Sequence, residues 1–72
     1  MKKENISLIL GNRIKELRTN AQYSQESFAD KIGVHRTYMG AIERGEKNIT
    51  ILTAQKIANG LGISISELLK KI

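Results

Sequence analysis

The sequence predicts an all-α domain of five short helices, and three observations lead to this fold class. Apolar residues recur at helical spacing along nearly the whole chain. Ser and Thr stand where helices should begin, and Gly stands where they should end. The best candidate for a strand, residues 63–65, is too short. Because the 72 residues contain no linker-like or repeated stretch, we expect one domain over residues 1–72.

The first two helices are predicted to be joined by a short turn. The first helix is expected from Ile6 or Leu10 to Ala21, with one apolar face formed by Leu10, Ile14, Leu17 and Ala21. Ser24 is the expected N-cap of the second helix, because its hydroxyl can accept a hydrogen bond from a free amide of the first turn. This helix turns Phe28, Ala29 and Ile32 inward. Gly33 is expected to end it in a left-handed conformation.

Three further helices complete the predicted fold. The third is expected from His35 to Arg44, with Met39 and Ile42 on its inner face and Gly45 as its stop. Thr50 can cap the fourth, which ends at Gly62 and has an apolar face of Ala54, Ile57, Ala58 and Leu61. The fifth is expected over residues 64–72, where Ser64 and Glu67 form a capping box. Its apolar face would carry Leu68, Leu69 and Ile72.

The composition excludes several classes of protein. Twelve Lys and Arg against seven Asp and Glu give a formal charge of +5, which favours attraction to nucleic acid. The absence of Cys excludes a disulfide framework and a Cys-based zinc site, and it favours a cytoplasmic location. No nucleophile, base and orienting group emerge from the spacing, so we expect neither catalysis nor a metal or cofactor. The basic residues are dispersed, which argues against a membrane-bound helix.

The second and third helices, over about residues 24–45, match the geometry of a helix-turn-helix. In that motif the second helix enters the DNA major groove. The third helix keeps its apolar residues for packing, while its first turn offers four donors: His35, Arg36, Thr37 and Tyr38. Arg can bind a guanine with two hydrogen bonds, so this turn is suited to reading base edges. Candidate phosphate contacts surround it, namely Gln25, Arg44, Lys47 and Asn48.

These residues resemble the lambda-repressor and Cro-like helix-turn-helix family. The resemblance covers about residues 12–69 and rests on Ser24-Gln25-Glu26-Ser27-Phe28-Ala29, Ile32-Gly33-Val34, Ile42-Glu43-Arg44-Gly45, Ile57-Ala58, Leu61-Gly62-Ile63-Ser64 and Glu67-Leu68-Leu69. Residues 35–49 are similar to the same segment of restriction-modification controller proteins, which are short regulators of this family.

The resemblance implies a homodimer on a pseudo-palindromic double-stranded DNA operator, with the third helix in the major groove. It implies base contacts by Arg36, Thr37 and Ala41. It also implies phosphate contacts by Gln25, Tyr38, Lys47 and Asn48. His35 can contact phosphate or simply begin the helix, and RNA polymerase is a candidate further partner.

The resemblance further implies an ion pair between Arg18 and Glu43, which is either a buried tie between helices or an exposed pair of little consequence. Three positions depart from the family pattern. Gln22 stands where many members have Gly, and a left-handed Gln costs about 1–2 kcal/mol. Ser27 stands where many have Glu, which predicts an incomplete capping box. Gly40 lies inside a helix, so either DNA or the second helix should approach it closely.

The C-terminal residues are expected to form the dimer interface. One short terminal helix cannot bury all the apolar side chains found here, namely Ile63, Ile65, Leu68, Leu69 and Ile72, so part of the set should face a partner. The residues expected in the dimer interface are Ile63, Ile65, Leu69 and Ile72. A purely intramolecular core is the alternative. For function, we keep two alternatives to the controller: an antitoxin-type module that binds a toxin, and a prophage-type repressor.

Overall fold

The computed structural model describes residues 5–70 and confirms the all-α class. It contains α1 (Ile6–Asn20), α2 (Gln25–Ile32), α3 (Arg36–Glu43), α4 (Ile51–Leu61) and α5 (Ile65–Leu68), and residues 5–70 form no strand. The predicted order of five helices is therefore right. The predicted bounds of the first four helices lie within one residue of the observed ones, if α1 is taken from Ile6.

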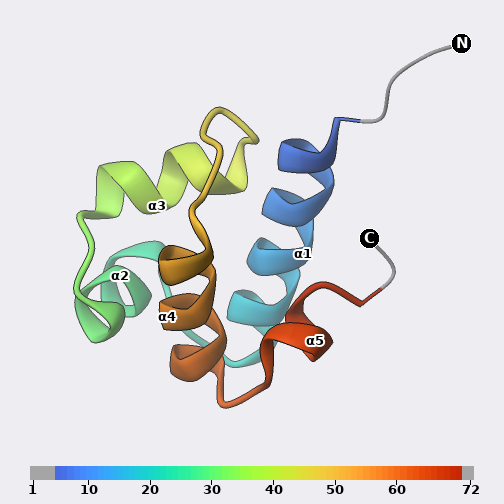
Figure 1. The fold of residues 1–72 in the computed structure, drawn as a ribbon. Coiled ribbons are helices and arrows are strands. Elements are labelled where there is room, and N and C mark those ends of the chain that lie inside the picture. Colours follow the sequence, from blue (N-terminus) through green and yellow to red (C-terminus); the bar gives the residue numbers. More distant parts are fainter. Residues whose placement is uncertain (1–4, 71–72) are drawn as a thin grey trace, which may run out of the picture.

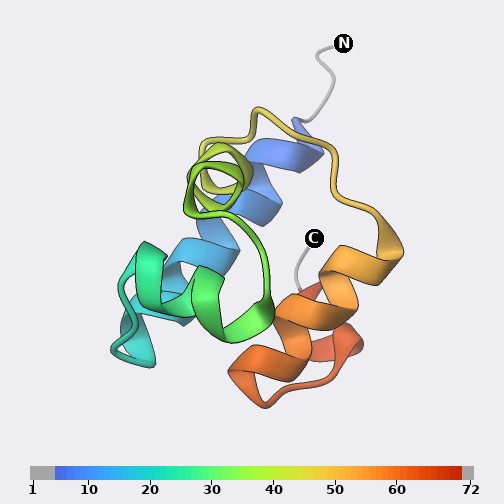
Figure 2. The same cartoon turned by 90° about the vertical axis from the view of Figure 1, so that its left-hand side faces the viewer.

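The helices enclose one small core. Helix α1 packs against α3 and α4, while α2 packs against α3 and α4, and α5 packs against α4 (Figure 1). The largest fully buried side chains come from all five helices: Ile14, Phe28, Met39, Ile42, Ile57 and Leu68. Tyr23 covers this core from the turn between α1 and α2, with its ring 5.3 Å from that of Phe28. The arrangement leaves the first turn of α3 at the surface (Figure 2).

The helix ends follow the predicted caps, with two corrections. Ser24 and Thr50 accept hydrogen bonds from the third amide of their helices, and α2 and α4 close on left-handed Gly33 and Gly62. The prediction of an incomplete box on α2 was wrong, because the Ser27 hydroxyl reaches back and accepts from the Ser24 amide at 3.0 Å. On α5 the Glu67 amide donates to Ser64, but its carboxylate lies 3.4 Å from Arg13 instead.

The C-terminal helix is shorter than predicted. Helix α5 ends at Leu68, and Leu69 is its C-cap. Leu68 is fully buried, Ile63 and Ile65 are half-buried against the core, and Leu69 is exposed. Ile72 lies outside the described residues. The expected apolar helix over residues 64–72 is therefore shortened to one turn, and two of its apolar side chains, Ile65 and Leu68, pack in the chain's own core.

A glycine fixes the crossing of α1 and α3. A Cβ at Gly11 would overlap the carbonyl oxygen of Ile42 and lie 2.8 Å from that of Glu43. The backbone of α1 therefore passes directly over the C-terminal end of α3, a contact for which only glycine leaves room. At the other end of α1, Gln22 has φ 69°, so this site, where many family members have Gly, is left-handed and the strain expected for that case applies.

Candidate nucleic-acid interface

The first turn of α3 carries the predicted base-reading side chains. His35 is the N-cap of α3, and its Nδ1 accepts a hydrogen bond from the Thr37 amide at 3.1 Å. Of the two roles expected for His35, the structure therefore shows the one in which it begins the helix. Arg36 and Thr37 are exposed, whereas Tyr38 is half-buried against the core. Met39 and Ile42 are buried and fix the rotation of α3, which turns Arg36 and Thr37 outward.

A buried ion pair ties α1 to the far end of α3. Arg18 donates through Nε and Nη2 to the two carboxylate oxygens of Glu43 at 2.6 and 3.0 Å, and both side chains are buried. Arg18 also donates to the Tyr23 carbonyl at 2.7 Å. Each end of the pair is thus hydrogen-bonded, which is the condition for a buried pair to be tolerated. Of the two alternatives, the buried tie is confirmed.

The same carboxylate orients a residue of α2. Gln25, the first residue of α2, donates from Nε2 to Glu43 at 2.9 Å, which leaves its amide oxygen toward Gly40. Gly40 is buried, and a Cβ there would lie 3.1 Å from the Arg44 guanidinium and 3.4 Å from the Gln25 oxygen. The tight contact at Gly40 is therefore with the flexible Arg44 side chain, whereas Gln25 of α2 lies at ordinary van der Waals distance, so the expected close approach of α2 is not found.

A polar hollow of about 240 Å³ opens over Gly40. Gln25, Arg36, Thr37, Gly40 and Arg44 line it, so four of the predicted contact residues from two helices meet at one place. Two guanidinium groups and an amide at the start of α2 can donate hydrogen bonds to a phosphate oxygen. Arg36 also borders a second hollow, which includes His35 and the acidic residues Glu26 and Asp30.

Arg44 is already paired at this surface. Its Nε and Nη2 donate to the carboxylate of Glu46 at 2.9 and 3.1 Å, and both side chains are more than half exposed. The hydrogen bond from Arg44 lowers the pKa of Glu46 and raises that of Arg44. The predictions did not include Glu46 in the site, although its spacing from Arg44 was visible in the sequence.

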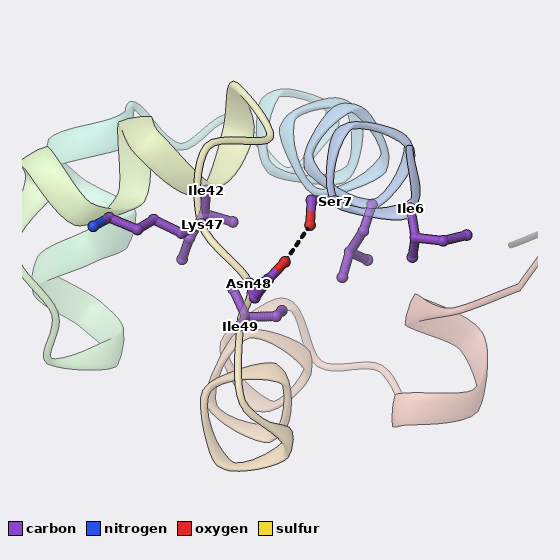
Figure 3. A pocket seen from close by; sticks show the side chains of 7 residues that line it. Ile6, Ser7, Ile42, Lys47, Asn48 and Ile49 are labelled. Carbon is purple, nitrogen blue, oxygen red and sulfur yellow. Dashed lines mark hydrogen bonds between the residues drawn. The ribbon is translucent and has the colours of Figure 1, made fainter. Parts of the chain in front are cut away.

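The loop after α3 is held against the start of α1. The Ser7 hydroxyl donates to Asn48 Oδ1 at 2.8 Å, across an apolar hollow of about 190 Å³ that includes Ile6, Ile42 and Ile49 (Figure 3). The Asn48 oxygen is therefore used, and its amide nitrogen is the group left to donate. Lys47 extends away from the hollow (Figure 3). Ser7 was missed because nothing near it in sequence marks a partner 41 residues away.

The remaining predicted residue, Ala41, is buried. Among residues 5–70, neither Arg36 nor Lys47 takes part in an ion pair, whereas Arg44 does. No group of three or more His, Asp or Glu within that range can hold a metal ion. The same part of the chain contains no helix with the length and apolarity needed to cross a membrane.

Comparison with known proteins finds the same architecture in transcriptional regulators. The family model described as "Helix-turn-helix" matches residues 14–68. The control protein C.MunI of a Mycoplasma species is 44% identical over 68 residues, which cover 93% of this chain and 92% of that protein.

Solved structures agree with this comparison. The restriction-modification controller protein C.AhdI from Aeromonas hydrophila is 39% identical and superposes with a TM-score of 0.82, covering 85% of this chain and 92% of that one. The biofilm regulator SinR, solved in complex with DNA, is 35% identical with a TM-score of 0.80, covering 85% of this chain and 98% of that one.

Proposed function

This chain belongs to the helix-turn-helix family of transcriptional regulators, and from that premise we propose that it is the controller protein of a restriction-modification system. In this role it binds a pseudo-palindromic DNA operator as a homodimer and regulates transcription without catalysing a reaction. The similarity to C.MunI over nearly the full length of both chains supports the controller over the antitoxin and prophage alternatives. The proposal places the protein in the cytoplasm.

The observation that carries the proposal is the polar hollow at the junction of α2 and α3. It gathers Gln25, Arg36, Thr37 and Arg44, which were predicted as DNA contacts from two separate helices. With α3 in the major groove, the exposed Arg36 and Thr37 meet base edges while Gln25 and Arg44 lie toward phosphates. Lys47 and the Asn48 amide extend the phosphate contacts beyond the end of α3. Tyr38 and His35 remain proposed phosphate contacts, and Ala41, at 7% exposure, is the least accessible of the residues proposed to contact bases.

Two substitutions test these roles against each other. Arg36→Ala should cost about 1–3 kcal/mol of binding free energy at the operator and relax the preference for one base pair. Lys47→Ala should weaken binding to all sequences alike and lower the slope of log affinity against log salt by about one. Binding would be measured by fluorescence anisotropy on operator and scrambled duplexes. An equal loss of specificity from both variants would contradict the assignment.

The operator itself provides a second test. Selection from random DNA, followed by footprinting, should reveal two half-sites whose centres lie about 34–36 Å apart, one turn of the duplex. If no sequence is preferred over bulk DNA at moderate salt, the proposal is wrong. Transcription in vitro with RNA polymerase, at a promoter containing the selected site, then shows whether the bound protein activates or represses. A direct contact with polymerase would appear as cooperative binding of the two proteins.

A further inference from the structure

The loop that connects α3 to α4 rests on the first turn of α1 (Figure 2). This loop, residues 44–50, carries Lys47 and Asn48, which are proposed to contact phosphates beyond the end of α3. The hydroxyl of Ser7, in the first turn of α1, donates to Asn48 Oδ1 at 2.8 Å (Figure 3). Within residues 5–70 the Asn48 side chain makes no other hydrogen bond, so its direction depends on Ser7.

Backbone packing holds the same loop at a second point. Gly45 has φ 75°, and a Cβ at this position would lie 2.7 Å from the Cα of Leu8. The chain therefore leaves α3 directly against α1. Ile42 is buried and Ile49 is half-buried against the core, so the backbone is fixed on both sides of the loop. What this packing leaves undetermined is the rotamer of the exposed Asn48 side chain.

The hydrogen bond decides which end of the Asn48 amide is free. Because the oxygen accepts from Ser7, the two N–H groups of the amide are left for an acceptor outside the chain. A DNA phosphate accepts hydrogen bonds, so the nitrogen is the end of the amide that can contact it. A side chain that is already held in this orientation also loses less rotational freedom when DNA binds.

We propose that Ser7 is a positioning residue for DNA binding, which acts by presenting the Asn48 amide nitrogen to a phosphate. This inference rests on the proposed function and adds to it a residue that acts through Asn48 and not on DNA itself. Both side chains are uncharged, so their hydrogen bond releases no counter-ions. Ser7 should therefore raise the affinity for every DNA sequence without changing the salt dependence, unlike the cation Lys47.

Helix α1 thus serves the proposed interface near both of its ends, although it carries none of the proposed DNA contacts. Near its C-terminal end, Arg18 holds Glu43, and Glu43 orients Gln25 at the start of α2. Near its N-terminal end, Ser7 orients Asn48. Gln25 precedes α3 in the chain and Asn48 follows it, so α1 positions phosphate contacts in the segments on both sides of that helix.

Two serines provide a matched comparison. Ser7 and Ser66 each occupy the second position of a helix, in α1 and in α5, and α5 lies at the opposite end of the molecule from the loop (Figure 1). Ser7→Ala should weaken binding to operator and scrambled duplexes alike by about two- to tenfold in fluorescence anisotropy. The slope of log affinity against log salt should stay the same. Ser66→Ala should change either affinity by less than about twofold.

Two controls accompany this comparison. Thermal unfolding should show that both variants remain folded, and sedimentation equilibrium should show the oligomeric state of the wild-type chain. A change in DNA affinity then reflects the interface and not folding or assembly. Ser7→Thr keeps the hydroxyl and should retain the wild-type affinity to within about twofold. An affinity as low as that of Ser7→Ala would count against the hydrogen bond.

A double-variant cycle separates positioning from a general effect of Ser7. In an Asn48→Ala background, Ser7→Ala should have no further effect on DNA affinity, because the side chain that it positions is absent. Equal losses with and without Asn48 would overturn the inference.

The same variants keep the inference apart from the proposed function. If Asn48→Ala weakens DNA binding and Ser7→Ala does not, Ser7 is not a positioning residue, while the phosphate contact by Asn48 stands. If neither variant changes the affinity for the operator, the inference is overturned together with that contact, and the rest of the interface stands. A wild-type chain that binds no DNA would instead disprove the proposed function itself.

NMR relaxation tests the positioning in the absence of DNA. The order parameter of the Asn48 side-chain amide should lie above about 0.6 in the wild-type chain and fall below about 0.6, the range of flexible groups, in Ser7→Ala. The same order parameter in both proteins would show that Ser7 does not hold this side chain.

Discussion

One Arg–Glu pair lies at the C-terminal end of α3 and another lies just beyond it. The two pairs have the same chemical groups and similar hydrogen bonds, but they differ in how far they are exposed to solvent. Both have two hydrogen bonds between guanidinium and carboxylate, at 2.6 and 3.0 Å for Arg18–Glu43 and at 2.9 and 3.1 Å for Arg44–Glu46. The side chains of the first pair are 7% and 2% exposed, and those of the second are 59% and 56% exposed.

The difference shows that burial, not geometry, decides what an ion pair does. In the buried pair each charge has lost its water, so either one left alone is costly. Its role is to hold α1 on α3 and, through Glu43, to orient Gln25. The exposed pair contributes little to folding because water and salt screen it. If Arg44 contacts a DNA phosphate as proposed, it can leave Glu46 without loss of the fold.

The largest expected effect comes from breaking the buried pair. Arg18→Met should lower the free energy of unfolding by about 3–5 kcal/mol, because the Glu43 carboxylate is left buried without its counter-charge. Urea unfolding followed by circular dichroism measures this. The double variant Arg18→Met with Glu43→Leu should recover part of the loss, although the bond from Arg18 to the Tyr23 carbonyl stays broken. A double variant as unstable as the single one would contradict the role given to the charge.

The next largest effect is expected at Gly40, which lies beside Arg44 of the exposed pair and beside Gln25, the hydrogen-bond partner of the buried pair. Gly40→Ala should gain up to about 1 kcal/mol of helix propensity, while its methyl, 3.1 Å from Arg44 Nη1, moves that guanidinium slightly and stays in ordinary contact with Gln25. We expect the unfolding free energy to change by less than about 1 kcal/mol and the affinity for operator DNA to fall several-fold. Loss of stability with unchanged DNA affinity would show that the glycine serves the fold alone.

A smaller effect on binding is expected from the exposed pair. Glu46→Gln should leave stability unchanged and raise the affinity for any DNA several-fold at low salt, because Arg44 is released toward phosphate. The slope of log affinity against log salt should steepen by about one. Arg44→Ala provides the control. If Glu46→Gln has the same effect in that background, the gain comes from removing a negative charge near DNA and not from freeing Arg44.

The smallest effect is on the pH dependence of stability. The hydrogen bond from Arg44 lowers the pKa of Glu46 below its ordinary value, so the folded chain binds this proton less readily than the unfolded chain. The contribution of the pair is therefore fully present above the ordinary Glu pKa and is lost as pH falls through the lowered one. Between pH 6 and 8 it should be constant. Carboxyl NMR titration should show the Glu46 pKa rising in Arg44→Ala.

Much of the fold was predictable because its signals are local. Caps and stops act within one turn, so Ser24, Gly33, Thr50 and Gly62 mark their helix ends in the sequence itself. The predictions were wrong where more than one side chain can cap a helix start. The Ser27 hydroxyl completes the box that Glu usually completes, whereas the Glu67 carboxylate turns to Arg13. Which solution forms depends on neighbours that are distant in sequence.

The candidate site divides in the same way. Its residue types and their order along α2 and α3 were predictable, and so was the pairing of Arg18 with Glu43 through the resemblance. The burial of that pair was not predictable, and neither were the hydrogen bonds from Gln25 to Glu43 and from Ser7 to Asn48. These contacts join residues that lie 18 to 41 positions apart, and hydrophobic periodicity carries no information about such distant pairs.

The sequence by itself determined an all-α chain of five helices with a helix-turn-helix at residues 24–45, because hydrophobic spacing and capping are properties of neighbouring residues. Only the tertiary structure decided which apolar side chains remain at the surface. It buried Leu68, half-buried Ile63 and Ile65, and left Ile51 and Leu52 exposed. The physical reason is that exposure depends on how helices pack against one another, and the same apolar residue can be core or interface according to the face its neighbours cover.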